Sequence, residues 1–305
     1  SITVGACCDN LTVEDEPEPP GPVDLGGYYV STTGSDDTGD GSFLNPWATW
    51  QKGFTEITAG DTLYIRGGTY TPAATYQDPR YFGVVVNGVS GTSGNKITVL
   101  NYPGEVPVLD CRNIVNDARR VGIGLYDCDH WILRGLNVTR VDQHSTGDVS
   151  VGVLLYGCDN ILVDECNMYN NQGMGLDVST GSSNILILNC DAYENHDPYS
   201  SYGSADGFGS NDNTYQASII FRGCRSWNNS DDGFDYYGDN AVVTTDGCWA
   251  WHNGYREDGV TPGGDGSGFK LGITDAHPAD LLRILQNNLA FSNRRAGINS
   301  NSANC

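Results

Sequence analysis

The sequence predicts an all-β solenoid, in which short strands and tight turns return in successive stacked coils. Two observations predict this class. The 305 residues include 40 glycines, 38% are hydrophobic and only 18% are charged, a composition that suits strands and turns better than helices. A six-residue pattern, Cys-x-x-aromatic-x-Asn, also recurs through the second half of the chain, as the coils of a solenoid do.

The first 26 residues are predicted to form an arm with no core of its own. The segment Glu14–Pro22 interleaves acidic residues with prolines, a composition typical of a stiff linker. We therefore divide the chain into an arm at residues 1–26 and a solenoid domain at residues 27–305. No basic-then-apolar signal segment begins at Ser1, so we expect any such signal to have been removed or never included.

The start of the domain is predicted to close one end of the solenoid. Tyr28–Ser31 and Ala59–Ile65 have the composition of short strands, and Pro46–Ile57 has the proline start and apolar spacing of one short helix. This opening resembles the N-terminal cap and first coil of secreted right-handed parallel β-helix proteins. The resemblance implies that the helix covers the open end of the apolar column.

The repeat fixes the register of the remaining coils. Successive copies are 24, 34, 24 and 40 residues apart, and the longer intervals are predicted to be standard coils with inserted loops, which gather on a functional face in solenoids. The five copies begin at Cys166, Cys190, Cys224, Cys248 and Asn288.

Stacking of the copies predicts ladders of identical side chains. The asparagines are expected to hydrogen-bond from coil to coil, and the aromatic residues to form a core ladder rather than a sugar platform. The asparagines are Asn171, Asn195, Asn229, Asn253 and Asn293, and the aromatic residues are Tyr169, Tyr193, Trp227, Trp251 and Phe291. Most internal cysteines are expected to be unpaired core residues. Four cysteines outside the pattern, Cys7, Cys8, Cys111 and Cys305, are the better disulfide candidates.

The charge of the chain limits its partners. A formal net charge of −22 argues against nucleic acid and against an anionic membrane surface. It also weakens the case for a polyanionic substrate, unless bound cations and a local cluster of Arg and Lys reverse the sign at one site. No apolar run approaches the roughly 20 residues needed to insert into and span a bilayer.

A cluster of carboxylates is the candidate metal site. Asp231, Asp232 and Asp235 surround a glycine, and carboxylate oxygens are the ligands that a hard cation such as Ca²⁺ prefers. Asp206 and Asp232 each precede a Gly-Phe step, and a third Gly-Phe step directly precedes Lys270. If the three steps are equivalent, these side chains occupy three successive coils about 4.8 Å apart and lie within roughly 10 Å of one another.

Three segments in this region resemble polysaccharide lyase family 9, whose pectate lyases fold as right-handed parallel β-helices. They are Ala205–Gly209, Gly223–Asp235 and Gly266–Gly272. The resemblance implies that Asp206, Asp231, Asp232 and Asp235 are calcium ligands and that Lys270 is the catalytic base. It further implies a secreted, extracellular or periplasmic enzyme that cleaves a pectate-like acidic polysaccharide by β-elimination, with Ca²⁺ as cofactor. The chain departs from the family after the fifth repeat, where Ala296–Asn299 replaces a Gly-Phe-Asp-Gln-like step.

Substrate contacts are predicted beside the carboxylates. Tyr236 and Tyr237 directly follow Asp235 and are candidates for stacking on sugar rings. Arg222 and Arg225 are candidate partners for substrate carboxylates, and Arg256 and Arg283 are further possibilities that the sequence does not rank.

Two other functions remain open at the level of sequence. Asp231 and Asp232 could act as the paired carboxylates of a β-helical glycosidase, although the chain has no Gly-His-Gly segment to accompany them. A non-catalytic structural or carbohydrate-binding β-helix stabilised by calcium would also fit the acidic arm and the ten cysteines. An unsaturated product would distinguish a lyase from both.

Overall fold

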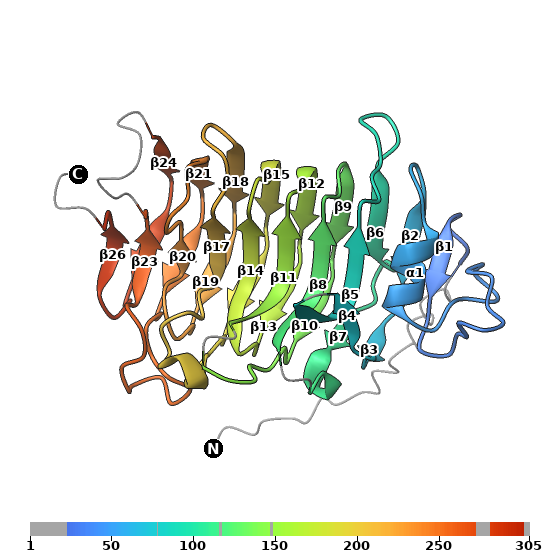
Figure 1. Cartoon of the computed structure of the whole chain (residues 1–305), viewed down its shortest axis with the longest axis horizontal. Helices are drawn as coiled ribbons and strands as arrows, with labels where there is room; N and C mark the ends of the chain where they lie inside the picture. The colour runs from blue at the N-terminus through green and yellow to red at the C-terminus, as the bar shows by residue number, and fades with distance from the viewer. Residues whose placement is uncertain (1–22, 78, 116–117, 147–148, 273–280, 302–305) are drawn as a thin grey trace, which may run out of the picture.

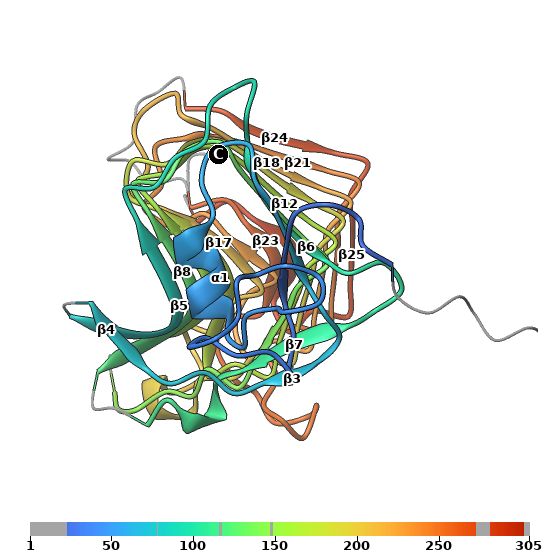
Figure 2. The same ribbon diagram turned by 90° about the vertical axis from the view of Figure 1, so that its right-hand side faces the viewer.

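A computed structural model describes residues 23–301, apart from residues 78, 116–117, 147–148 and 273–280. The chain is a parallel β-helix in which each coil contributes one strand to each of three long sheets (Figures 1 and 2). The pairing between sheet neighbours is parallel throughout, except for the antiparallel hairpin β4–β5 at the edge of one sheet. The predicted all-β solenoid is therefore confirmed.

Each coil passes through the first, second and third sheets in turn. The first sheet contains β1 (Tyr28–Val30), β2 (Thr62–Ile65), β6 (Ile97–Asn101), β9 (Trp131–Arg134), β12 (Asp159–Asp164), β15 (Ser183–Leu188), β18 (Ser218–Arg222), β21 (Val242–Asp246) and β24 (Arg283–Gln286). The second sheet contains β3 (Gly68–Tyr70), β7 (Pro107–Asp110), β10 (Asn137–Thr139), β13 (Asn167–Tyr169), β16 (Asp191–Tyr193), β19 (Arg225–Trp227), β22 (Trp249–Trp251) and β25 (Leu289–Phe291). The third sheet contains β4 (Thr75–Gln77), β5 (Arg80–Asn87), β8 (Arg119–Tyr126), β11 (Ser150–Tyr156), β14 (Gly173–Ser179), β17 (Phe208–Asn211), β20 (Phe234–Asp235), β23 (Ser267–Lys270) and β26 (Ala296–Asn299). Short 3-10 turns occur at Cys111–Asn113 and Pro198–Ser200.

One short helix caps the N-terminal end of the column, as predicted. It is α1 (Trp50–Glu56), shorter than the predicted range because Trp47 is extended and forms a bridge with Val30. Its N-cap residue Thr49 accepts the backbone N–H of Lys52. In the end-on view α1 lies across the opening of the coil (Figure 2). Among the described residues, no helix is long or apolar enough to span a bilayer.

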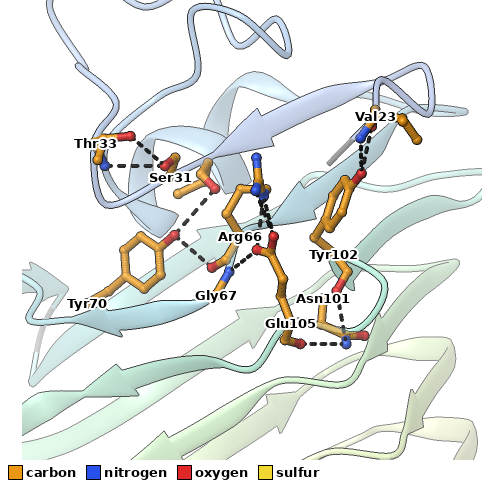
Figure 3. Close-up of polar contacts among 10 residues, drawn as sticks. Val23, Ser31, Thr33, Arg66, Gly67, Tyr70, Asn101, Tyr102 and Glu105 are labelled. Atoms are coloured by element: carbon orange, nitrogen blue, oxygen red, sulfur yellow. Dashed lines mark hydrogen bonds and ion pairs between the residues drawn. The ribbon is translucent and has the colours of Figure 1, made fainter. Parts of the chain in front are cut away.

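Polar contacts fasten the first coil to its neighbours (Figure 3). Arg66 forms a two-pronged ion pair with Glu105, with Nη2 2.7 Å from Oε1 and Nε 2.9 Å from Oε2. The Tyr102 hydroxyl accepts the N–H of Val23 at 2.6 Å. Val23 therefore already contacts the β-helix, while residues 1–22 of the predicted arm lie outside the described residues. The boundary at residue 26 stays a prediction.

The asparagine ladder is confirmed. Asn229 Oδ1 accepts both the backbone N–H and the side-chain amide of Asn195, at 3.1 and 2.9 Å, and Asn229 Nδ2 donates to Asn253 Oδ1 at 3.0 Å. The same exchange joins Asn171 to Asn195 and Asn253 to Asn293. Because these amides are mostly buried, each satisfied pair fixes the register of one coil on the next.

The aromatic residues form the predicted ladder, but not in the core. Tyr193 and Trp227 stack with centroids 4.4 Å apart, and Trp227 and Trp251 stack at 4.8 Å, both with rings 5° from parallel. The residue before each ring, such as Ala192 or Ala250, is the one that points into the column. Since neighbours on a strand face opposite sides, the rings lie on the outer face of the second sheet. Each ring face in the middle of the ladder is covered by the next ring and is closed to a sugar.

The internal cysteines are confirmed as unpaired core residues. Free, buried thiols are found at Cys128, Cys158, Cys166, Cys190, Cys224 and Cys248. Cys111 is also a free, buried thiol, so its prediction as a disulfide candidate is wrong. The other three candidates, Cys7, Cys8 and Cys305, lie outside the described residues.

A row of glycines bends the third sheet. At Gly233, an added Cβ would lie 2.6 Å from the carbonyl oxygen of Gly268 on the next coil, so no larger residue fits there. In a regular strand, residues two apart face the same side. On β8, Val121 and Ile123 lie on either side of Gly122 but pack in different apolar clusters, so the alternation of the strand is interrupted at this glycine. The residue before each glycine and the residue two after it therefore face the same side of the bend.

Candidate active site

The bend places the predicted site residues on adjacent strands. Phe208, Phe234 and Phe269 pair in register across β17, β20 and β23, so the three Gly-Phe steps are equivalent, as expected. The same pairing sets Asp235 directly beside Lys270. Three successive coils thus bring carboxylates and a lysine together.

Three carboxylates form a buried group at the bend. Asp206, Asp232 and Asp235 offer oxygen atoms that all lie within 4.8 Å of one another. One oxygen of each accepts a backbone N–H: Asp206 from Asp232 at 2.9 Å, Asp232 from Ser267 at 2.5 Å and Asp235 from Tyr237 at 2.8 Å. These bonds orient the carboxylates, and Oδ2 of Asp232 is buried without a hydrogen-bond partner. A buried, all-oxygen group of carboxylates fits a hard divalent cation.

Lys270 lies over this group. Its Nζ is 2.9 Å from Asp232 Oδ2, in an ion pair that lacks hydrogen-bond geometry, and 3.0 Å from Asp235 Oδ2. A third carboxylate, Asp265, has Oδ2 at 3.7 Å from Nζ. The side chain is only 12% exposed. The amine is thus held by carboxylates at the surface of the bend.

The aspartates of the site carry more negative charge than Lys270 can balance. Burial, followed by the charges of neighbouring aspartates, raises the pKa of Asp231 to about 8 and places the pKa of Asp206 well above its usual range. Burial is also the main cause that raises the pKa of Asp235 to about 6. Burial lowers the pKa of Lys270, but the carboxylates outweigh it and hold that pKa above its ordinary value. A divalent cation would offset the carboxylates and lower the pKa of the lysine.

A pH titration of stability tests this charge imbalance. Without metal, the folded protein retains protons on Asp231 and Asp235 that the unfolded chain releases near its ordinary carboxyl pKa of 3.8. Stability falls with pH wherever the folded state binds more protons. In a chelator, Tm should therefore decline between about pH 4 and pH 8, and calcium should remove the decline. A chelator-treated Tm that rises through this window would contradict the described charge balance.

An open cavity adjoins the lysine. It has a volume of about 440 Å³ and is lined by Lys270, Asp231, Asp265, Arg294 and three glycines. Asp231 does not belong to the group of three, because its Oδ1 faces this side and accepts the backbone N–H of Asp265 at 2.5 Å. A reacting group could approach Lys270 from this cavity.

Comparison with known proteins identifies the fold and its relatives. The model of the Pel9A-like, right-handed β-helix region matches residues 28–305. The chain belongs to this family. It is 33% identical over 299 residues to pectate lyase PEL9 of Emericella nidulans, covering 90% of this chain and 69% of that protein. The right-handed parallel β-helix and the resemblance to family 9 are thereby confirmed.

Two solved structures superpose on the chain. A rhamnogalacturonan lyase matches with a TM-score of 0.77 and 28% identity, covering 88% of this chain and 68% of that one. Pectate lyase Pel9A matches with a TM-score of 0.70 and 28% identity, covering 90% and 65%. The chain therefore spans about two thirds of the length of these relatives. The predicted enzyme class, a polysaccharide lyase, is confirmed at the level of the family.

Three of the predicted substrate contacts of this family member lie elsewhere. Tyr236 is fully buried and its hydroxyl is 2.6 Å from Thr245 Oγ1, so its prediction as a sugar platform is wrong. Arg222 is on the first sheet and pairs with Asp246, and Arg225 is on the second sheet and pairs with Asp191. Both arginines are therefore engaged away from the bend.

Tyr237 is the one predicted substrate contact beside the lysine. It is 59% exposed, and Lys270 Nζ lies 5.8 Å from the centre of its ring. Its role as a sugar platform stays a prediction, as do the roles of the aspartates as metal ligands.

Sequence reasoning missed three residues at the site. Asp265 lies in an inserted loop, where no repeat marks its position. Arg294 and Arg295 directly follow Asn293, just as Ser230 and Asp231 follow the ladder residue Asn229, and this equivalence could have identified them.

Proposed function

We propose that the protein is a calcium-dependent lyase that cleaves a uronate-containing acidic polysaccharide by β-elimination, with Lys270 as general base. One observation carries the proposal: Lys270 Nζ lies between buried carboxylates that fit a cation and a cavity open to a substrate. The pectate and rhamnogalacturonan lyases among the relatives support the substrate class. Extracellular or periplasmic action on such a polymer is part of the same proposal.

The chemistry requires a weak carbon acid to lose its proton. When bound, a calcium ion would neutralise the uronate carboxylate and stabilise the negative charge that develops beside it. Lys270 in its neutral form accepts the proton from C5 of the sugar. The electron pair of that C–H bond forms the C4–C5 double bond, and the C4–O bond breaks. The leaving oxygen then takes up a proton from solvent water, and the new end is 4,5-unsaturated.

The described residues hold this base in position. Asp232 and Asp235 fix Nζ at 2.9 and 3.0 Å, and both belong to the predicted metal site. A cation at those carboxylates would weaken their hold on the lysine proton. We therefore infer that metal binding and the formation of the neutral base are coupled, which favours an alkaline optimum.

The experiment is a direct assay for the unsaturated product. Purified protein with added calcium should raise the ultraviolet absorbance of polygalacturonate or rhamnogalacturonan solutions and should leave neutral polysaccharides unchanged. New reducing ends without absorbance would indicate a glycosidase instead. Failure to cleave any uronate polymer while calcium is bound would support a calcium-stabilised, non-catalytic β-helix and would overturn the proposal.

A further inference from the structure

Two arginines lie one coil beyond Lys270: Arg294 lines the same cavity, and both arginines line an adjoining open pocket with Asp265. Arg294 and Arg295 occupy the turn between β25 and β26. Their backbone is fixed to the coil of Lys270, because Arg294 N–H donates to Asn253 O and Arg295 N–H donates to Gly266 O, both at 2.9 Å. Both residues are exposed. The turn therefore holds their positions while leaving the guanidinium groups accessible.

The guanidinium groups retain donors for a ligand. In the described part of the chain, both contacts of the Arg294 group are to backbone carbonyls, those of Gly264 and Asp265. Arg295 Nη1 pairs with Asp265 Oδ2 at 2.9 Å, and this carboxylate is 45% exposed. An exposed ion pair contributes little to stability, because water screens both charges. An incoming anion can therefore replace Asp265 at little cost.

We propose that Arg294 and Arg295 bind the carboxylate of the uronate unit next to the one from which Lys270 takes its proton. This inference rests on the proposed function. The order of the coils supports it, because the bend presents first Asp206, then Asp232 and Asp235, then Lys270, and then the arginine pair. Coils rise about 4.8 Å apart, a step comparable with one sugar unit of an extended polymer. A unit that follows the reacting one along the bend would thus reach the arginines.

The chemistry of the pair suits a carboxylate. Guanidinium groups bind carboxylates through two parallel hydrogen bonds, which a neutral hydroxyl or an ester cannot match. The chain carries a net charge of −22, so a polyanion needs local positive charge where it binds. Arg294 and Arg295 supply that charge beside the cavity. They therefore select acidic polymers over neutral or methyl-esterified ones.

The test separates binding from turnover. In the double variant Arg294→Ala/Arg295→Ala, KM for polygalacturonate should rise roughly 10- to 100-fold, the loss expected for hydrogen bonds to a charged group, while kcat changes little. The rise in KM should be smaller on methyl-esterified polymer, and KM should depend less on salt than in the wild type. Arg134→Ala is the matched control, because Arg134 is an exposed arginine paired with Asp164 on the first sheet, away from the bend.

Calorimetry with the Lys270→Ala variant tests the arginines without catalysis. Polygalacturonate should bind this variant, and the two arginine substitutions should weaken that binding by the same factor. Unchanged binding, or equal weakening by Arg134→Ala, would overturn the arginine proposal, as would the absence of any polyuronate binding. If binding is lost with the arginines but the wild type eliminates no uronate polymer, the binding site stands and the proposed function fails.

Discussion

Replacement of Lys270 by alanine is expected to abolish elimination while leaving the fold intact. Loss of a general base lowers kcat by roughly 100- to 10,000-fold. The side chain lines the open cavity and is not part of the apolar core, so its removal leaves no cavity in the column. The measurement is the initial rate of absorbance at saturating polymer and calcium, with Tm recorded for the same preparation.

Calcium affinity distinguishes a catalytic lysine from a structural one. Nζ is 2.9 and 3.0 Å from the carboxylates of Asp232 and Asp235, so a protonated lysine repels a cation held there. Lys270→Ala should therefore bind calcium at least as tightly as the wild type. The control is Lys52→Ala, which removes a partly exposed lysine paired with Glu56 on the capping helix and should retain full activity. A Lys270→Ala enzyme with near-normal kcat would exclude this lysine as the base.

The register of the site was predictable because the repeat leaves little choice. Because the asparagines of successive coils pair with one another, the Gly-Phe steps that follow them lie on neighbouring strands. The separation of Asp206 from Lys270, 64 residues along the chain, then becomes two coils. In a solenoid, sequence spacing converts directly into distance along the axis.

Side-chain direction was harder to predict than register. Tyr236 follows the strand that carries Asp235, and simple adjacency to the carboxylates suggested an exposed ring. The chain turns there, and the ring instead packs inward with its hydroxyl against Thr245. The aromatic ladder was misplaced for a related reason, since stacked rings satisfy the repeat equally well on either face of the sheet. The residue before each ring could have identified the inner face, because it is small in four of the five copies, as at Ala192.

The positions of residues in inserted loops could not be predicted from the repeat. Asp265 contacts both Lys270 and Arg295, yet its loop has no counterpart in the other coils from which a position could be derived. The bend itself was visible in the sequence only as three Gly-Phe steps. Its cause, the close approach of each glycine to the carbonyl of the next coil, is a property of the packed structure.

The substitution Asp206→Asn is expected to change stability in opposite directions with and without calcium. Asp206 is 1% exposed. Among the described contacts, its Oδ1 accepts a hydrogen bond from the backbone N–H of Asp232, and an asparagine oxygen can accept the same bond. The substitution removes the charge and replaces one carboxylate oxygen with an amide NH2 group. Without metal, the variant should have a higher Tm than the wild type at pH 8, because burial and the neighbouring aspartates disfavour the charged form of Asp206 and an amide carries no such cost.

With calcium the order should reverse. Removal of one charged oxygen ligand weakens binding of a hard cation, so the stabilisation that calcium gives through mass action should fall. Activity at limiting calcium should drop more than tenfold, which corresponds to about 1.4 kcal/mol, and excess calcium should restore part of it. A chelator should abolish wild-type activity, and calcium should restore it better than magnesium, which keeps more of its own water.

Asp258→Asn is the matched control for charge. Asp258 lies in the inserted loop, is exposed and bonds only within its own turn among the described contacts, to Val260 and Thr261. Its substitution should leave calcium affinity unchanged and should produce no reversal of Tm. If Asp206→Asn lowers Tm equally with and without calcium, the carboxylate serves packing alone. The buried aspartates would then be a structural network, and the cation would have to bind elsewhere.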